Sequence, residues 1–241
     1  MSRYPSGLRW VTFVMLLGLA LGCRPPSRVD RRAPDSDRPG ARLILYSGFD
    51  SLGKSEGWHS YDYDGGIESG PDLFHPVSWE PRGGAFGSGY IWTDDSRWRI
   101  DTPEQPNSIL ALIFYRRWVG GPKLDLRGAR ISVNLRGDDL DLKGAQCYFW
   151  AHIRNNRWHF TDQPIPISQG SWGRRHTFVL ENDETKWTRT WAWTGPASLD
   201  RVLRECVSYG FSFIGFPEGE EVTGRLSMDV LRIEARVADM R

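Results

Sequence analysis

Short apolar runs with a period of two recur along residues 42–237, and clusters of Gly, Pro, Asn and Asp separate them. In the segment ARISVNLRG, for example, Ile131, Val133 and Leu135 alternate with polar residues. Because strand side chains point alternately to the two sides of a sheet, this pattern predicts a strand with one buried face. About nine or ten such strands and few helical segments favour an all-β sandwich.

Other segments add to this prediction. Two aromatic runs flank Asn155-Asn156 and predict a hairpin, because asparagine tolerates positive φ. One helix is expected at Ser198–Cys206, with Ser198 as its N-cap. Further strands are expected at residues 42–49, 90–92, 98–100, 108–115, 172–180, 209–216 and 224–237.

The N-terminus has the pattern of a targeting signal. Arg3 and Arg9 precede an apolar run at residues 10–22 that is too short for a comfortable membrane span. Cys23 follows at once, and Ala20-Leu21-Gly22-Cys23 resembles the bacterial lipobox, in which the cysteine becomes lipid-modified. This resemblance implies a signal peptide at 1–22 and a lipid-anchored protein of the bacterial cell envelope. An ordinary signal peptide with a chance cysteine stays open.

Residues 23–41 contain that cysteine and a segment rich in Pro, Arg, Asp and Ser. This composition predicts a flexible tether, with the folded domain at 42–241. In the enteric pattern, Arg rather than Asp at position 24 implies sorting to the outer membrane rather than the inner one.

Charge and cysteine content limit the function further. Two of the 31 basic residues lie in the signal segment, so residues 23–241 carry 29 basic and 30 acidic residues. This balance argues against a nucleic-acid partner, because such proteins usually have a basic face. Cys147 and Cys206 are expected to be buried free thiols, although an envelope compartment permits a disulfide.

Several short motifs follow one another in a set order. They are Phe49-Asp50, Trp58, LDLRGARISVNLRG at 124–137, a WG…FVL segment from Trp172, SLDRVL at 198–203, Gly215-Phe216, Gly224 and Met228-Asp229-Val230. This order resembles the galactose-binding-like jelly roll of many carbohydrate-binding modules. The resemblance covers residues 43–237 and implies a jelly-roll β-sandwich with one short helix.

The same resemblance implies one structural calcium ion. Jelly rolls of this type often hold it with acidic residues at the places of Asp50 and Asp229. Calcium prefers such hard oxygen ligands. The alternative is that Asp50 caps a turn and Asp229 faces water.

Catalytic motifs are absent from the sequence. It contains no HExxH, GxSxG, phosphate-binding loop or dinucleotide fingerprint, and no Glu-x-Asp-x-x-Glu of the jelly-roll glucanases. We therefore expect no enzyme activity. Two carboxylates from distant strands could still form an acid–base pair, so this alternative stays open.

Sugar recognition needs flat rings that stack on a pyranose and planar polar groups for its hydroxyls. Tyr148, Trp150 and His152 share one face of a strand whose other face is apolar, and an exposed Trp on such a face needs a reason. A second packing layer over this face is the alternative. The candidate ligand-binding residues here are Tyr148, Trp150, His152, Trp158, Arg136, Arg154 and Arg157.

The segment KWTRTWAWTG at 186–195 adds two candidates. Trp187, Trp191 and Trp193 fall at odd positions together with Arg189, so one strand face would hold all four. Because an unpaired buried charge is costly, we expect at least one of these tryptophans in the core and at least one exposed. Trp187 is predicted to be the exposed one and, with Arg189, to bind ligand.

The favoured interpretation is a lipid-anchored envelope protein whose domain binds a glycan or polysaccharide without catalysis. A structural or assembly lipoprotein that uses the same face for an envelope protein is the alternative. A polysaccharide hydrolase or lyase is less favoured.

Overall fold

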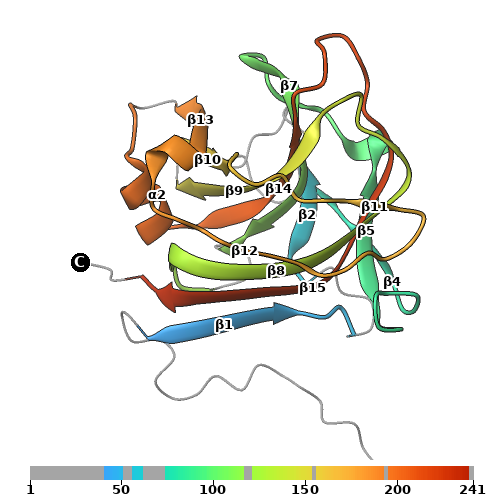
Figure 1. Cartoon of the computed structure of the whole chain (residues 1–241), viewed down its shortest axis with the longest axis horizontal. Coiled ribbons are helices and arrows are strands. Elements are labelled where there is room, and N and C mark those ends of the chain that lie inside the picture. Colours follow the sequence, from blue (N-terminus) through green and yellow to red (C-terminus); the bar gives the residue numbers. More distant parts are fainter. Residues whose placement is uncertain are drawn as a thin grey trace, which may run out of the picture. The chain divides into compact units, whose positions relative to one another are not determined.

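The computed structural model describes residues 41–50, 56–61, 74–116, 121–153, 156–192 and 195–238. These residues form mainly strands, arranged in two sheets that pack on each other (Figure 1). The predicted all-β jelly-roll sandwich with one short helix is confirmed. The predicted signal peptide, Cys23 and all but the last residue of the tether lie outside the described residues.

The smaller sheet has seven strands in the order β11-β8-β15-β5-β4, with β1 also on β15 and β12 also on β8. Its two long strands, β8 and β15, run side by side in antiparallel register, and β1 lies along β15 (Figure 1). The strands are β1 (Arg42–Ser47), β4 (Ser78–Glu80), β5 (Tyr90–Asp94), β8 (Leu124–Asp141), β11 (Ser168–Gln169), β12 (His176–Val179) and β15 (Thr223–Val237).

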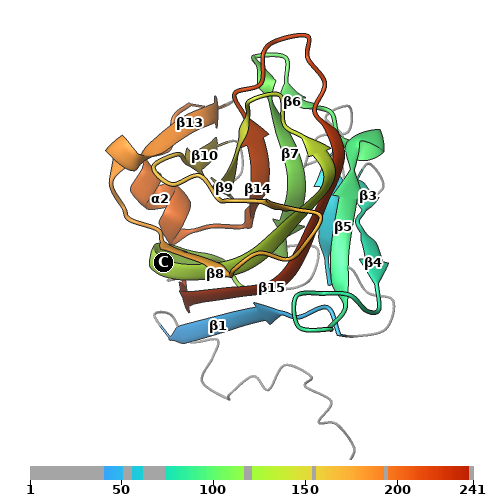
Figure 2. The same ribbon diagram turned by 45° about the vertical axis from the view of Figure 1, so that its right-hand side comes forward.

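The larger sheet has eight strands in the order β13-β10-β9-β14-β7-β2-β3, with β6 also on β7 (Figure 2). The strands are β2 (Trp58–Tyr61), β3 (Phe74–Pro76), β6 (Ile100–Thr102), β7 (Gln105–Tyr115), β9 (Gln146–Ile153), β10 (Asn156–Phe160), β13 (Trp187–Ala192) and β14 (Ser208–Ile214). Two 3₁₀ turns, η3 (Asp95–Arg97) and η4 (Glu184–Lys186), precede β6 and β13.

The main core lies between the two sheets and is rich in aromatic side chains. Trp58 contacts the rings of Phe114, Tyr209 and Phe211, with centroids 5.3, 6.0 and 6.3 Å away. The predicted apolar face of β9 is confirmed, because its residues Cys147, Phe149, Ala151 and Ile153 all belong to this core.

Cys147 and Cys206 are both buried and free, as expected. Burial raises the pKa of the Cys206 thiol to about 12, so this thiol is neutral near pH 7. No helix among the described residues is long and apolar enough to cross a membrane.

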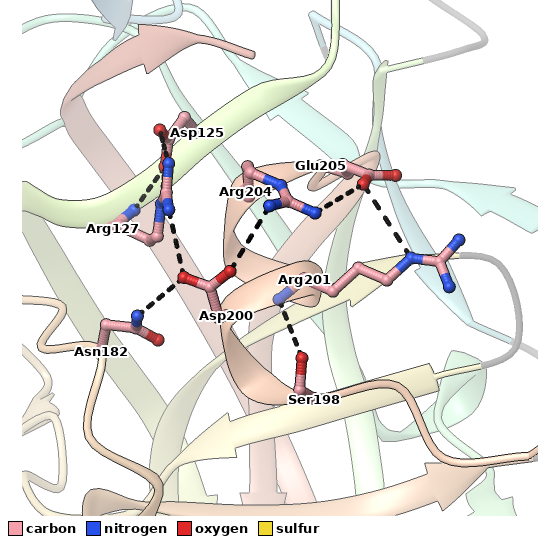
Figure 3. Close-up of polar contacts among 8 residues, drawn as sticks. All are labelled: Asp125, Arg127, Asn182, Ser198, Asp200, Arg201, Arg204 and Glu205. Atoms are coloured by element: carbon pink, nitrogen blue, oxygen red, sulfur yellow. Dashed lines mark hydrogen bonds and ion pairs between the residues drawn. The ribbon is translucent and has the colours of Figure 1, made fainter. Parts of the chain in front are cut away.

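Helix α2 (Leu199–Arg204) confirms the predicted helix and its cap. The Arg201 N–H donates to Ser198 Oγ at 3.4 Å. Leu199, Val202 and Leu203 are buried against the sandwich. On the outer side, Asp200 pairs with Arg127 of β8, which links the helix to the smaller sheet (Figure 3).

Two predicted strands are shorter in the structure than expected, whereas the predicted hairpin forms. The strand predicted at 172–180 is limited to β12, because Trp172 turns away and its Nε1 donates to Gly83 O at 2.6 Å. The strand predicted at 98–100 begins only at Ile100, since Trp98 caps η3. The predicted hairpin is confirmed by the pairing of Ile153 with Asn156, although its turn residues 154–155 are outside the described part.

The prediction that Trp187 is exposed is wrong. Its side chain is 5% exposed, packs on Phe160 and donates from Nε1 to Glu181 O at 2.8 Å. The pairing of β10 with β13 shifts by one residue, so that Trp187 lies opposite Phe160 and Trp191 opposite Arg157. Such a bulge moves the following side chains to the other face. Trp187 and Trp191 therefore lie on opposite faces, and Trp193 is outside the described residues.

Candidate functional site

The outer face of the larger sheet, away from the core, carries a second buried layer of side chains. Across this face Trp150 of β9 lies opposite His159 and Gly210, and His152 lies opposite Arg157 and Ser208. We call this set the polar layer. Its members are Asp101, Ser108, Trp150, His152, Arg157, His159, Ser208 and the half-buried Trp191.

A buried ion pair between Arg157 and Asp101 organises this layer. Their side chains are 2% and 0% exposed, and Arg157 Nη2 donates to Asp101 Oδ2. The two residues come from β10 and β6, which β9, β14 and β7 separate in the sheet order. Four strand spacings of a flat sheet would place them about 19 Å apart, so the sheet edge must bend over this face.

Aromatic rings enclose the guanidinium of Arg157. Its carbon lies 5.9 Å from the ring centre of Trp150 and 5.7 Å from that of Trp191. The His152 ring stacks on Trp191 at 5.7 Å. Positive charge over an aromatic face is favourable, and more so away from water. The layer thus combines stacked rings with hydrogen-bonding groups.

Many polar atoms of the layer have no hydrogen-bond partner in the described part of the chain. Native proteins satisfy nearly all buried polar groups, and each exception costs about 1–3 kcal/mol. Among the residues that the structure describes, eight atoms of this layer are buried without a hydrogen bond. They are Asp101 Oδ1, Ser108 Oγ, Trp150 Nε1, His152 Nδ1 and Nε2, Arg157 Nε, His159 Nε2 and Ser208 Oγ.

Both histidines of the layer are neutral near pH 7. Burial, followed by the charge of Arg157, lowers the pKa of His152 to about 3. The same two causes lower the pKa of His159 well below its usual range. Each neutral ring offers one donor and one acceptor, and His159 Nδ1 shares a hydrogen bond of 2.9 Å with Thr190 Oγ1.

The structure keeps two predicted site residues of β9 together but not at the surface. Trp150 and His152 lie in the polar layer at 0% and 1% exposure, so their predicted exposure is wrong and the alternative, a second packing layer, is correct. Tyr148, on the same face, is half-buried and donates to Gln146 Oε1 at 2.6 Å.

Trp158 and Arg189 do not join the polar layer. Trp158 packs in the main core at 7% exposure, so it lies on the face of the larger sheet opposite to the polar layer. Its buried position follows from the alternation of β10, in which Arg157 and His159 point to the other side. Arg189 is exposed, with its guanidinium carbon 5.7 Å from the Trp158 ring centre.

Arg136 belongs to the other sheet. It lies on β8, between the rings of Tyr90 and Trp172 at 5.1 and 4.9 Å, and pairs with Asp138 at 2.8 Å. The predicted ligand set is therefore divided between two sheets, and Arg154 lies outside the described residues.

Asp101, Ser208 and His159 were not predicted. The period of two in NRWHF could have placed His159 beside Arg157. Asp101 has no such signal, because it is 56 residues from its partner in sequence.

Asp50 and Asp229, the predicted calcium ligands, lie near each other. Asp229 is fully buried, which excludes the alternative that it faces water. Its Oδ2 accepts from Ala85 N–H and Ser88 O–H, and its Oδ1 accepts from Val230 N–H, each at 2.7 Å. Burial is the main cause that raises the pKa of Asp229, and the charge of the exposed Asp50 adds to it.

These contacts fit a calcium ion poorly. Calcium takes about six to eight oxygen ligands, whereas three donors already occupy Asp229. The described residues include no group of three or more His, Cys, Asp or Glu that could hold a metal ion. The calcium ion stays a prediction: if it binds, a chelator lowers the melting temperature, and an unchanged temperature removes it.

Two surface hollows lie apart from the polar layer. One, of about 790 Å³, is lined in part by Trp98, Ile109, Phe216 and Glu221. The other, of about 440 Å³, lies around Asp139. Neither contains a residue of the polar layer, so neither shares its unpartnered groups.

No protein-family model and no curated protein matches this chain. The chain is similar to solved carbohydrate-binding modules at low identity. CtCBM11 is 13% identical with a TM-score of 0.36, covering 82% of this chain and 96% of the module. The CBM22-1-GH10 modules of Clostridium thermocellum endo-1,4-beta-D-xylanase 10B, complexed with xylohexaose, are 8% identical with a TM-score of 0.38, covering 82% of this chain and 29% of that one.

A protein of unknown function from Shewanella oneidensis MR-1 is also similar, at 12% identity and a TM-score of 0.35, covering 86% of this chain and 91% of that one. Because these TM-scores are low, the fold is assigned from this chain's own strand order and not from the similar structures.

The ion pair of the polar layer generates a stability prediction. Arg157→Met leaves Asp101 buried without its partner, so we expect the free energy of unfolding to fall by about 3–5 kcal/mol. Arg157→Met with Asp101→Leu removes both charges and should recover most of this loss. Urea unfolding of the three proteins measures it. A loss below about 1 kcal/mol for Arg157→Met would show that the pair does not organise the layer.

Proposed function

We propose that the folded domain binds a neutral glycan, without catalysis, through the polar layer of the larger sheet. The observation that carries this proposal is a set of buried donors and acceptors beside Trp150 and Trp191 that have no hydrogen-bond partner among the described residues. Sugars offer hydroxyl groups that both donate and accept, and C–H faces that pack on aromatic rings.

The chemistry of the layer favours hydroxyl groups over charged ones. Trp150 Nε1 and Arg157 Nε only donate, Asp101 Oδ1 only accepts, and the neutral histidines do both. The charges of Arg157 and Asp101 offset each other within their ion pair. A charged ligand would therefore lose its hydration without meeting an opposite free charge.

The composition of the layer supports binding rather than hydrolysis. Glycoside hydrolysis ordinarily uses two carboxyl groups that flank the scissile bond. Among the described residues of the polar layer, Asp101 is the only carboxylate, and Arg157 already holds it. The hydrolase or lyase alternative predicts release of reducing sugar, which a standard assay detects.

We further propose that the protein is lipid-anchored at Cys23 in the bacterial cell envelope, at the outer membrane. The supporting observation is the lipobox-like sequence Ala20-Leu21-Gly22-Cys23 and the polar tether that follows it. Cys23→Ser should leave unprocessed precursor without lipid. A variant that is cleaved and keeps its place in the membrane fraction would contradict the anchor.

A matched pair of tryptophan variants tests the glycan proposal. Trp191 and Trp172 are both half-buried and both lie against an arginine. Trp191 is in the larger sheet, whereas Trp172 precedes β12 and packs on Arg136 of the smaller sheet. Binding is first found on a glycan array and then measured by calorimetry. Trp191→Ala should weaken binding about tenfold or more, which corresponds to about 1.4 kcal/mol, whereas Trp172→Ala should not.

Other results of these binding measurements would relocate the ligand site or contradict the glycan proposal. If only Trp172→Ala weakens glycan binding, the ligand site would instead lie at Arg136 on the smaller sheet. No glycan bound by a domain that melts normally would contradict the proposal. Capture of an envelope protein through the polar layer would then favour the alternative, an assembly lipoprotein.

A further inference from the structure

The outer face of the smaller sheet, on β1, β15, β8 and β12, combines arginines with exposed apolar side chains. We call it the basic face. Strand registers fix its arrangement, because residues paired across strands lie side by side on one face. Across β1, β15, β8 and β12, one row consists of Ile44, Glu234, Arg130 and Val179. The next row consists of Tyr46, Arg232, Ser132 and Thr177. In a further pair, Arg42 of β1 lies beside Arg236 of β15.

Large apolar side chains are concentrated here. Five large hydrophobic residues are exposed in the described part of the chain, and three of them lie on this face. They are Ile44 at 45%, Tyr46 at 57% and Val179 at 43% exposure. β1 pairs only with β15, so it forms an edge of the sheet at which Ile44 and Tyr46 stand (Figure 2). Exposed apolar groups that gather on one face indicate an interaction surface.

The charge of this face is positive. Four arginines, Arg42, Arg130, Arg232 and Arg236, share this face with two acids. Glu234 pairs with Arg42 at 2.8 Å and with Arg232 at 3.0 Å, and Asp125, opposite Arg236, pairs with Arg127 at 2.8 Å. Within the described ranges, Arg130 and Arg236 have no ion pair, and both are exposed. The charge of Arg130 also acts on Glu234, its cross-strand neighbour, and both exposed guanidinium groups can contact an anionic partner without breaking an ion pair of the described residues.

The tether reaches the domain at this face. It ends where β1 begins at Arg42, and residues 24–41 contain five arginines and three aspartates. The flexible tether that this composition predicts would span about 23 Å on average and would hold the domain close to whatever carries its other end. A lipid on Cys23 would thus keep β1 near the membrane.

We propose that the basic face docks on a membrane surface of anionic phospholipids. The arginines would contact lipid phosphates, and Ile44, Tyr46 and Val179 would enter the headgroup region, where apolar and aromatic side chains are favourable. This site is distinct from the polar layer. The choice of a membrane as its partner rests on the proposed lipid anchor at Cys23. Because the two sheets turn their outer faces in opposite directions, docking directs the polar layer away from the membrane.

Vesicle co-sedimentation tests the docking without the anchor. The chain from Arg24 onward keeps every described strand and both buried clusters, and its melting curve verifies the fold. It is mixed with vesicles of phosphatidylglycerol and phosphatidylcholine, or of phosphatidylcholine alone. Binding is expected only to the anionic vesicles and should weaken as salt is added.

Paired substitutions assign the binding to this face. Each basic residue near an anionic surface contributes about fivefold to partitioning, so Arg130→Ala with Arg236→Ala should weaken it about 25-fold. Arg99→Ala with Arg201→Ala removes the same charge from exposed positions elsewhere and should change little. Ile44→Ser should weaken binding without changing its salt dependence.

Either of two vesicle results would overturn the proposal, and so would one result with a soluble polymer. One is the absence of binding to anionic vesicles at low salt, and the other is equal loss in the two arginine pairs. Binding to a soluble acidic polysaccharide but not to vesicles would also overturn it and would assign the face to that polymer. The glycan array is independent of these results, because it reports on the opposite sheet.

Discussion

The larger sheet is buried on both of its faces, and the rest of the structure depends on this constraint. Its inner face meets the apolar core around Trp58 and Phe149. Its outer face carries the buried ion pair between Arg157 and Asp101, which joins β6 to β10. A buried ion pair of this kind is weak as a source of stability, since desolvation offsets the attraction. Its position instead fixes where the polar groups around it point.

The two outer faces of the sandwich differ in chemistry. The polar layer holds uncharged histidines, stacked rings and one internal ion pair, which suits a neutral ligand rich in hydroxyl groups. The basic face holds exposed arginines and apolar side chains beside the entry of the tether. A domain built in this way can be held at a membrane by one side and present its binding groups on the other.

The sequence contained much of the fold but less of the site. Alternation correctly separated Phe149 from Trp150, because the period of two is a local property of β9. The same rule failed at Trp187, since a bulge shifts the β10–β13 pairing and leaves no mark in the residues themselves. Asp101 could not be predicted from the sequence, because it reaches the polar layer from a distant strand. Arg136 was assigned to the wrong face, because alternation does not show to which sheet a strand belongs.

NMR of the side-chain nitrogens of His152 and His159 tests the central claim, that the polar layer is a neutral hydrogen-bonding site. Both rings should stay neutral at pH values well below the usual histidine pKa, because both are buried beside Arg157. A neutral oligosaccharide that binds the domain should shift their signals and leave those of His176, on the smaller sheet, unchanged. Titration of both rings near their ordinary pKa, or a bound sugar that moves neither signal, would contradict the claim.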